Sequence, residues 1–199
     1  MIKQQAKSKP AWANVKAELV SFDRAGLISV IQSLYAAAEG NRAFLHARFG
    51  LGEDPLQPCK KTIHRWLRPN VFHGQAPSVS NAKKTIAEYK RALGDPQGLA
   101  ELMVFYCEQA AEFCRDVDYH HTAYIDALVR MFEQALKTTS DLNTKARKNF
   151  LTRLDRVRTI ARQLGYGVGD DMDVLLSEFA SSEEGAKRPK DLFQKYFVK

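Results

Sequence analysis

The sequence predicts an all-α protein: an array of seven to nine helices packed antiparallel, either as a bundle or as a short stack of helical hairpins. Three observations support this prediction. Apolar residues recur every three or four positions through most of the 199 residues, which is the period of one buried helix face. The alternating pattern of a β-strand is nearly missing. The breaks between the long apolar stripes are short, so neighbouring helices must run antiparallel.

The first helices are expected before residue 50. Pro10 suits the first turn of a helix that runs to about Val20, because proline needs no hydrogen bond there. A second helix should end near Gly40. Its buried face would consist of Leu27, Ile28, Ile31, Leu34 and Tyr35. Asn41 then resembles the cap of a short helix that ends at Gly50.

The middle of the chain alternates between loops and short helices. The segment GLGEDPLQP (residues 50–58) is a break rich in glycine and proline. A short helix with Ile63 and Trp66 on its apolar side follows, and Pro69 stops it. Ser80 is then expected to cap a helix that Gly94 closes.

The second half shows longer apolar stripes. Asp95 and Pro96 make a cap and a first turn for a helix to about Cys114. Asp118 should open the next helix. A further helix is expected over residues 142–164. Asp170 or Asp171 would cap a last, short one. These helices would belong to a single domain over residues 1–180, with a linker and an amphipathic C-terminal tail over 181–199.

Composition limits the class of protein. An apolar fraction of 45% is enough for a real core, and no segment approaches the roughly 18 apolar residues of a membrane span. No secretory signal is recognisable at the N-terminus. The three cysteines are too few and too odd in number for a disulfide framework. We therefore expect a cytoplasmic protein without membrane contact, whose cysteines are mostly buried as small apolar residues.

The net charge of +7 is distributed in alternating blocks. Residues 60–94 carry eight basic side chains and one acidic, and residues 143–163 carry seven and one. The block between 95 and 142 has three basic and nine acidic side chains, and residues 164–184 contain six acids. Basic and acidic blocks can neutralise each other after folding, which weakens the inference from a high isoelectric point to nucleic acid.

The two basic blocks nevertheless contain candidates for binding phosphate groups. Arginine and lysine interleave with Trp66 and Phe72, aromatic rings on which a base can stack. The candidate nucleic-acid-binding residues are Lys60, Lys61, Arg65, Arg68, Lys145, Lys148, Arg153 and Arg156. Two alternatives stay open: Trp66 belongs to the core, and the helix over 143–163 has a solvated polar face. Its internal partners would then be Asp116, Asp118, Asp126 and Glu133.

An acidic segment offers a weak candidate metal site. Glu108, Glu112 and Asp116 share one helix face, and His120 and His121 follow; these are ligand types for divalent metals. Adjacent histidines on a helix point about 100° apart, so they seldom share one site. An exposed acidic helix face is the commoner explanation. The chain shows no nucleophile elbow, P-loop or dinucleotide fingerprint, and we expect no cofactor.

Three segments carry a family resemblance: QSLYAAAEGNRAFLHARFG (32–50), SNAKKTIAEYKRAL (80–93) and LGYGVGDDMDVL (164–175). Over roughly residues 15–175 the chain resembles a family of small all-helical bacterial proteins classed only as a domain of unknown function. The resemblance implies a helical, cytoplasmic, bacterial protein and assigns no site residue.

The leading functional hypothesis is a non-enzymatic helical interaction module whose basic segments bind an acidic partner, either nucleic acid or an acidic protein. The first alternative is a protein-binding scaffold or a self-assembling subunit, which would form a homo-oligomer. The second is a metal-dependent hydrolase that uses the acidic helix.

Overall fold

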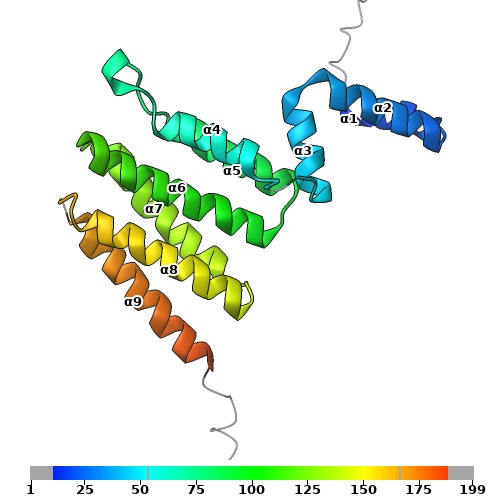
Figure 1. The fold of residues 1–199 in the computed structure, drawn as a ribbon. Coiled ribbons are helices and arrows are strands. Elements are labelled where there is room, and N and C mark those ends of the chain that lie inside the picture. Colours follow the sequence, from blue (N-terminus) through cyan, green and yellow to red (C-terminus); the bar gives the residue numbers. More distant parts are fainter. Residues whose placement is uncertain (1–10, 53, 166, 188–199) are drawn as a thin grey trace, which may run out of the picture. The chain divides into compact units, whose positions relative to one another are not determined.

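The computed structural model describes residues 11–52, 54–165 and 167–187, and Figure 1 shows its ribbon. Within these ranges the chain forms nine α-helices, which confirms the all-α prediction and the expected number of helices. The elements are α1 Trp12–Val20, α2 Arg24–Ala37, α3 Glu39–Phe49, α4 Gln57–Leu67, η1 (a 3₁₀ turn) Val71–His73, α5 Val79–Ala92, α6 Pro96–Val117, α7 Thr122–Thr139, α8 Thr144–Ala161 and α9 Val168–Lys187. None of the described helices combines the length and the apolar composition that a membrane span requires.

The chain divides into two compact units. The N-terminal unit comprises residues 1–55 with α1 to α3, and the C-terminal unit comprises residues 56–199 with α4 to α9. The sequence had predicted one helical domain over 1–180. Because each unit has its own contacts, we describe the two separately.

The C-terminal unit follows the stacked-hairpin alternative. α4 packs against α5, α6 against α7 and α8 against α9, and α6 also contacts α4 on one side and α8 on the other. Figure 1 shows these hairpins following one another across the unit. Short loops between antiparallel helices produce this order. It places α6 between the two basic helices α4 and α8.

The core of the C-terminal unit is centred on α6. The fully buried side chains of Leu102 and Tyr106 on α6 share one hydrophobic core with those of Leu128 and Phe132 on α7, the helix that packs against α6. Cys107 and Cys114 are buried as expected. The hydroxyl of Tyr124 donates a 2.9 Å hydrogen bond to the carbonyl of Leu67 and so ties α7 to the end of α4. This bond satisfies a hydroxyl that burial has removed from water.

The start of α6 follows the predicted capping chemistry: the Asp95 carboxylate accepts a 2.6 Å hydrogen bond from the Gly98 backbone. Asn143, for which the sequence analysis predicted no such role, caps α8 in the same way. For α5 the prediction of Ser80 was wrong, because the structure uses Ser78 as the cap. Short polar side chains two residues apart have equal capping propensity, and packing decides between them.

Two boundaries in the second half also differ from the prediction. Asp118 does not open α7; it ends α6 in the left-handed conformation, with φ 54°, and α7 begins at Thr122. Asp170 and Asp171 lie inside the first turn of α9 instead of capping it. α9 continues to Lys187, so the predicted linker is helical at its start, and the expected tail over 192–197 lies outside the described residues.

The N-terminal unit differs most from expectation. α2 contacts α3, the Tyr35 hydroxyl lies 3.0 Å from His46 Nε2, and Asn41 donates to the Leu34 carbonyl at 2.7 Å instead of capping a helix of its own. No described side chain of this unit is buried. The predicted buried face of α2, with Ile28 and Ile31, is exposed, because three short helices provide no further layer to cover it.

Candidate interaction surfaces

Four carboxylates form a ridge along α6. We call Glu101, Glu108, Glu112 and Asp116 the acidic ridge. Their spacing of seven, four and four residues places them on one side of the helix. They lie where α6 packs between α4 and α8, so cations from both basic helices reach them.

Arg153 on α8 binds the two N-terminal carboxylates of the acidic ridge, Glu101 and Glu108. Its guanidinium lies 2.5 Å from a Glu101 oxygen and 2.7 Å from each Glu108 oxygen. Lys60 of α4 approaches Glu101 to 3.0 Å from the other side. Burial favours a higher pKa for the Glu101 carboxyl, but hydrogen bonds from Arg153 and Lys60 outweigh it and lower that pKa. The hydrogen bonds that the Arg153 guanidinium donates to Glu108, ahead of those it donates to Glu101, raise the Arg153 pKa further above its ordinary value.

Arg68, directly after α4, binds the two C-terminal carboxylates of the acidic ridge, Glu112 and Asp116. It lies 2.9 Å from Glu112 and 2.7 Å from Asp116. A hydrogen bond from the neighbouring Arg115, and then one from Arg68, lowers the pKa of the Asp116 carboxyl. His64 contacts Gln109 at 2.7 Å between the two ion-pair groups. These contacts join α4, α6 and α8 along the whole ridge.

The predicted phosphate-binding set is therefore split by the structure. Carboxylates bind Lys60, Arg68 and Arg153, so for these three residues the structure shows neutralisation by acidic side chains, which the sequence had left open. Residues 45 to 52 positions apart in the sequence meet here, and sequence blocks alone do not reveal such pairing. The sequence analysis named Asp116, Asp118, Asp126 and Glu133 as partners for the basic side chains of α8. Arg153 instead binds Glu101 and Glu108.

Five of the predicted residues keep an exposed charge. We call Lys61, Arg65, Lys145, Lys148 and Arg156 the unpaired cations, because no ion pair joins them to a carboxylate in the described ranges. On α8 the three members recur at intervals of three and eight residues and lie on one exposed stripe with Thr152. The Arg65 guanidinium lies 5.1 Å from the Trp66 ring centroid.

The two candidate stacking aromatics behave differently. Trp66 is partly buried against the core, which supports the alternative that it belongs there. Phe72 in η1 is 86% exposed, the highest value among the large hydrophobic side chains of the C-terminal unit that the structure describes. Only Phe72 is placed to contact a partner.

The candidate metal ligands do not converge. Glu112 and Asp116 bind Arg68, while His120 contacts Asp118 at 2.5 Å. His121 stacks on Tyr119 with a centroid distance of 6.1 Å. Among the residues with described side chains, no group of three or more His, Cys, Asp or Glu is arranged to hold an ion. The metal-hydrolase alternative therefore has no assembled site in this part of the chain.

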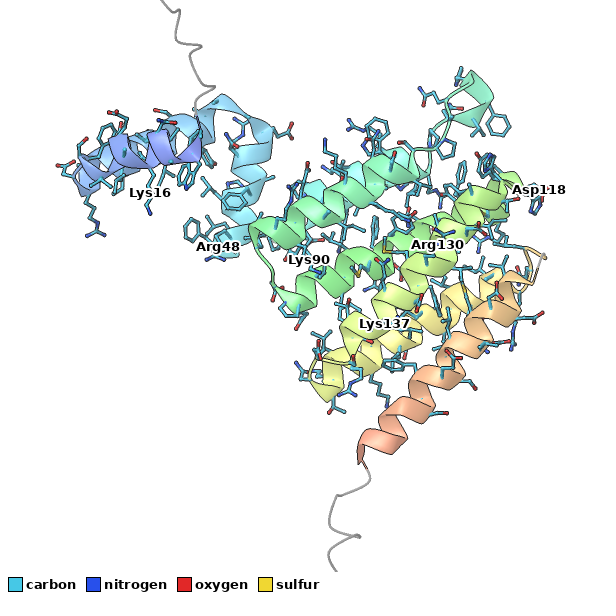
Figure 2. All side chains as sticks on the ribbon, turned by 180° about the vertical axis from the view of Figure 1, so that it is seen from behind. Lys16, Arg48, Lys90, Asp118, Arg130 and Lys137 are labelled. Atoms are coloured by element: carbon cyan, nitrogen blue, oxygen red, sulfur yellow. The ribbon has the colours of Figure 1, made fainter. Side chains whose placement is uncertain are left out.

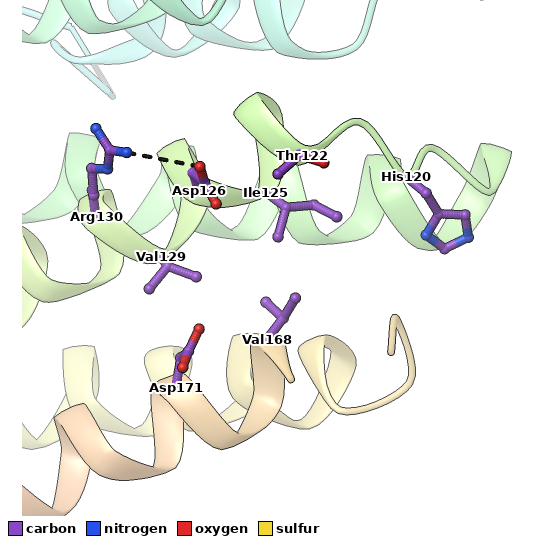
Figure 3. Close-up of a pocket in the computed structure, with 8 residues that line it drawn as sticks. All are labelled: His120, Thr122, Ile125, Asp126, Val129, Arg130, Val168 and Asp171. Atoms are coloured by element: carbon purple, nitrogen blue, oxygen red, sulfur yellow. Dashed lines mark ion pairs between the residues drawn. The ribbon is translucent and has the colours of Figure 1, made fainter. Parts of the chain in front are cut away.

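A pocket of about 310 Å³ lies between α7 and the start of α9 (Figure 3). Ile125, Val129 and Val168 contribute apolar side chains, and Asp171 points from α9 towards α7. Arg130, at 3.8 Å from Asp126, supplies the cation on its wall. Sequence reasoning did not identify this pocket, because its two sides come from helices that are distant in the chain. The pocket is lined by charges of both signs, and Arg130 is already paired with Asp126. The lining therefore favours no particular class of ligand.

The rear of the C-terminal unit carries scattered charges (Figure 2). The figure shows Lys90 on α5 and Arg130 and Lys137 on α7. Lys137 pairs with Glu133 one turn away. Exposed pairs of this kind contribute only about 0.3–0.5 kcal/mol each, and they make the rear an ordinary solvated surface.

The N-terminal unit presents the largest set of exposed apolar side chains. Twelve of the fourteen exposed large hydrophobic residues in the described chain belong to it. We call these twelve the N-terminal apolar surface: Trp12, Val15, Val20, Phe22, Leu27, Ile28, Ile31, Leu34, Tyr35, Phe44, Phe49 and Leu51. Scattered exposed hydrophobics are normal, but a dense set marks an interaction site.

Comparisons with known proteins return no match: the chain matches no protein-family model, no curated protein and no solved structure. The resemblance to a helical bacterial family stays a prediction.

Proposed function

We propose that the protein is a non-enzymatic interaction module that binds a protein partner through its N-terminal apolar surface. The C-terminal unit has its own core, and arginines bind its acidic ridge. In this module it is the stable unit to which the N-terminal unit is joined. This develops the protein-binding alternative that the sequence left open.

One observation carries the proposal: the N-terminal unit exposes twelve large hydrophobic side chains and buries none of those described. Its helices have 9, 14 and 11 residues, and isolated helices shorter than about 12–15 residues are marginal in water. Full burial of an exposed apolar side chain is worth roughly 1.5–3 kcal/mol, and these side chains still have about half of their surface in water. A unit of this size therefore gains its stability from a partner that covers this surface.

A non-enzymatic role is supported by how the carboxylates of α6 are used. Glu101 and Asp116 bind arginine and have lowered pKa values. A general acid or base works best with a pKa near the ambient pH. These side chains are thus suited to holding helices together.

The proposal is tested by co-purification from cells that express two differently tagged copies of the full chain. We compare the wild type, the variant Ile31→Glu with Leu34→Glu, and the control Lys145→Glu with Lys148→Glu, all washed in 0.5 M NaCl. We expect a stoichiometric protein, either a second copy or another chain, to stay bound to the wild type and the control and to be lost from the apolar variant. Equal recovery in all three, or no bound protein at all, contradicts the proposal.

A second candidate function is contact with a polyanion such as nucleic acid, which the five unpaired cations favour. Lys145, Lys148 and Arg156 share one exposed stripe, and the carboxylate at its edge, Asp155, is paired with Arg158. Five phosphate contacts give a slope of log K against log salt of about −4.5 on duplex DNA. Fluorescence anisotropy with labelled DNA or RNA between 50 and 300 mM NaCl measures this slope, and no binding at 50 mM removes the candidate.

We also propose that the module is cytoplasmic. None of its three cysteines forms a disulfide, and two of them are buried. Thiols of this kind suit a reducing compartment.

A further inference from the structure

We propose that the partner of the N-terminal apolar surface is the same surface of a second copy of this chain, so that two N-terminal units form a two-fold symmetric helical bundle. This inference rests on the proposed function and names its partner. Three observations favour a second copy over other occupants: the charge of α2, the spacing of its apolar residues and the area available.

The charge of α2 suits self-association. Its only charged residue is Arg24, at the first position, and its polar positions are Ser29, Gln32 and Ser33. A two-fold interface places the same patch on both partners, so a charged patch would meet its own sign. Residues 25–37 bring no such repulsion. A helix that lies on a lipid surface or on a polyanion carries Lys or Arg along its polar face, and these residues lack both.

The spacing of the apolar residues is that of a helix packed against other helices. Leu27, Ile31 and Leu34 are separated by four and three residues, and Ile28 and Tyr35 widen the stripe on one side. At 100° per residue these five side chains cover an arc of about 120°. An arc of this width is the core-facing stripe of a helical bundle, yet each of the five is at least 37% exposed within a single chain.

The apolar area matches a stable interface. Twelve side chains, each roughly half exposed, offer on the order of 1,000 Å² of apolar surface. A specific interface of the standard size buries about 800 Å² per partner, and in homodimers about 65% of that area is apolar, which is roughly 500 Å². About half of the N-terminal apolar surface is therefore enough for an interface of this size.

The mass of the full-length protein in solution tests the inference. We measure light scattering after size exclusion at roughly 10 and 100 µM, in 0.15 and 1 M NaCl. The expected mass is 45 kDa, twice the 22.5 kDa of one chain, and it is the same at both salt concentrations, because apolar contacts are not screened by salt. Ile31→Glu with Leu34→Glu should reduce it to 22.5 kDa, while Lys145→Glu with Lys148→Glu should leave it at 45 kDa.

A cysteine cross-link tests the geometry without disturbing the fold. Gln32→Cys places a thiol on α2 beside the apolar stripe, and we expect oxidation to link two chains into a covalent dimer. Thr152→Cys on the exposed stripe of α8 is the matched control, and it should link far less. Equal linking of both variants contradicts a dimer through the N-terminal apolar surface.

Hydrogen exchange of residues 11–52 separates failure of this inference from failure of the proposed function. A wild type of 22.5 kDa at 100 µM overturns the second copy as partner. If its backbone amides then exchange freely, the surface still needs another protein and the proposed function stands. If they are protected in the 22.5 kDa species, the surface is already covered within one chain and both proposals fail.

Discussion

Arg153 is the residue on which the charged face of the C-terminal unit depends. One guanidinium binds two carboxylates of the acidic ridge, and Lys60 shares one of them. The side chain of Arg153 is only 21% exposed, so water does not easily replace it. Glu101 and Glu108 lie two turns apart on α6 and bind the same guanidinium, which offsets their mutual repulsion; Lys60 adds to this at Glu101 alone.

Replacing Arg153 with methionine should destabilise the C-terminal unit by about 2 kcal/mol. Removing one partner from a largely buried ion pair leaves the other charges uncompensated, which costs about 3–5 kcal/mol when burial is complete and less here. Urea unfolding measures the change. Arg156→Met is the control on the same helix, since an exposed unpaired side chain should change stability by less than about 0.5 kcal/mol. Equal losses for the two variants contradict the role given to Arg153.

The lowered pKa of the Glu101 carboxyl predicts a stability loss in acid. Its folded pKa lies below the ordinary value of 4.5, so the stabilising contribution is complete above 4.5 and declines as the pH falls through the folded pKa. Thermal unfolding between pH 7 and pH 3 records this decline. Glu101→Gln should be less stable at pH 7 and should show a shallower decline. Asp141→Asn, which changes an exposed carboxylate, should keep the wild-type slope; the same flattening in both variants contradicts the assignment.

The helices themselves follow local rules except where tertiary contacts intervene. The sequence placed most helices of the C-terminal unit within a few residues of where they lie, since apolar period, caps and breaks are local properties. It missed the end of α6 because Asp118 adopts the left-handed conformation that glycine more often supplies. It ended α9 too early because the serine- and glutamate-rich segment that begins at Ser181 resembles a linker, whereas α9 continues to Lys187.

The contact between the end of α5 and the start of α6 leaves no space for a methyl group at Gly98. A Cβ built there would lie 2.0 Å from the Tyr89 hydroxyl and 2.8 Å from the ring carbon that bears it. Gly98→Ala should therefore lower stability by about 1–2 kcal/mol, because overpacking costs roughly 1–3 kcal/mol and alanine returns part of it through helix propensity. Chemical denaturation measures this loss. In a Tyr89→Phe background the loss should shrink, and an unchanged loss contradicts the steric explanation.

At the scale of the whole molecule, the two units differ in how they are stabilised. Every buried side chain in the described chain lies in the C-terminal unit. The N-terminal unit has helices, caps and apolar residues of the usual kinds, and it lacks a layer that covers them. Folding of the two units is therefore expected to be separable, with different dependence on protein concentration.

Calorimetry of the full chain should show this separation. We expect a main transition for the C-terminal unit at a temperature independent of protein concentration, and a smaller one that rises with concentration because association stabilises the N-terminal unit. Ile31→Glu with Leu34→Glu should remove the smaller transition and leave the main one within about 1 °C, since no core residue changes. A single transition that shifts as a whole with concentration contradicts two separately stabilised units.

The sequence by itself determined the helical class, the short connections and the apolar side of each long helix, because these are set by neighbours within a few residues. It did not determine which charges meet: Arg153 finds Glu101 and Glu108 only when α8 packs against α6. The apolar period of Leu27 and Ile31 likewise identified a face that avoids water without identifying what covers it. Periodicity is a property of one helix, whereas ion pairing and burial belong to at least two elements, and only the tertiary structure brings those together.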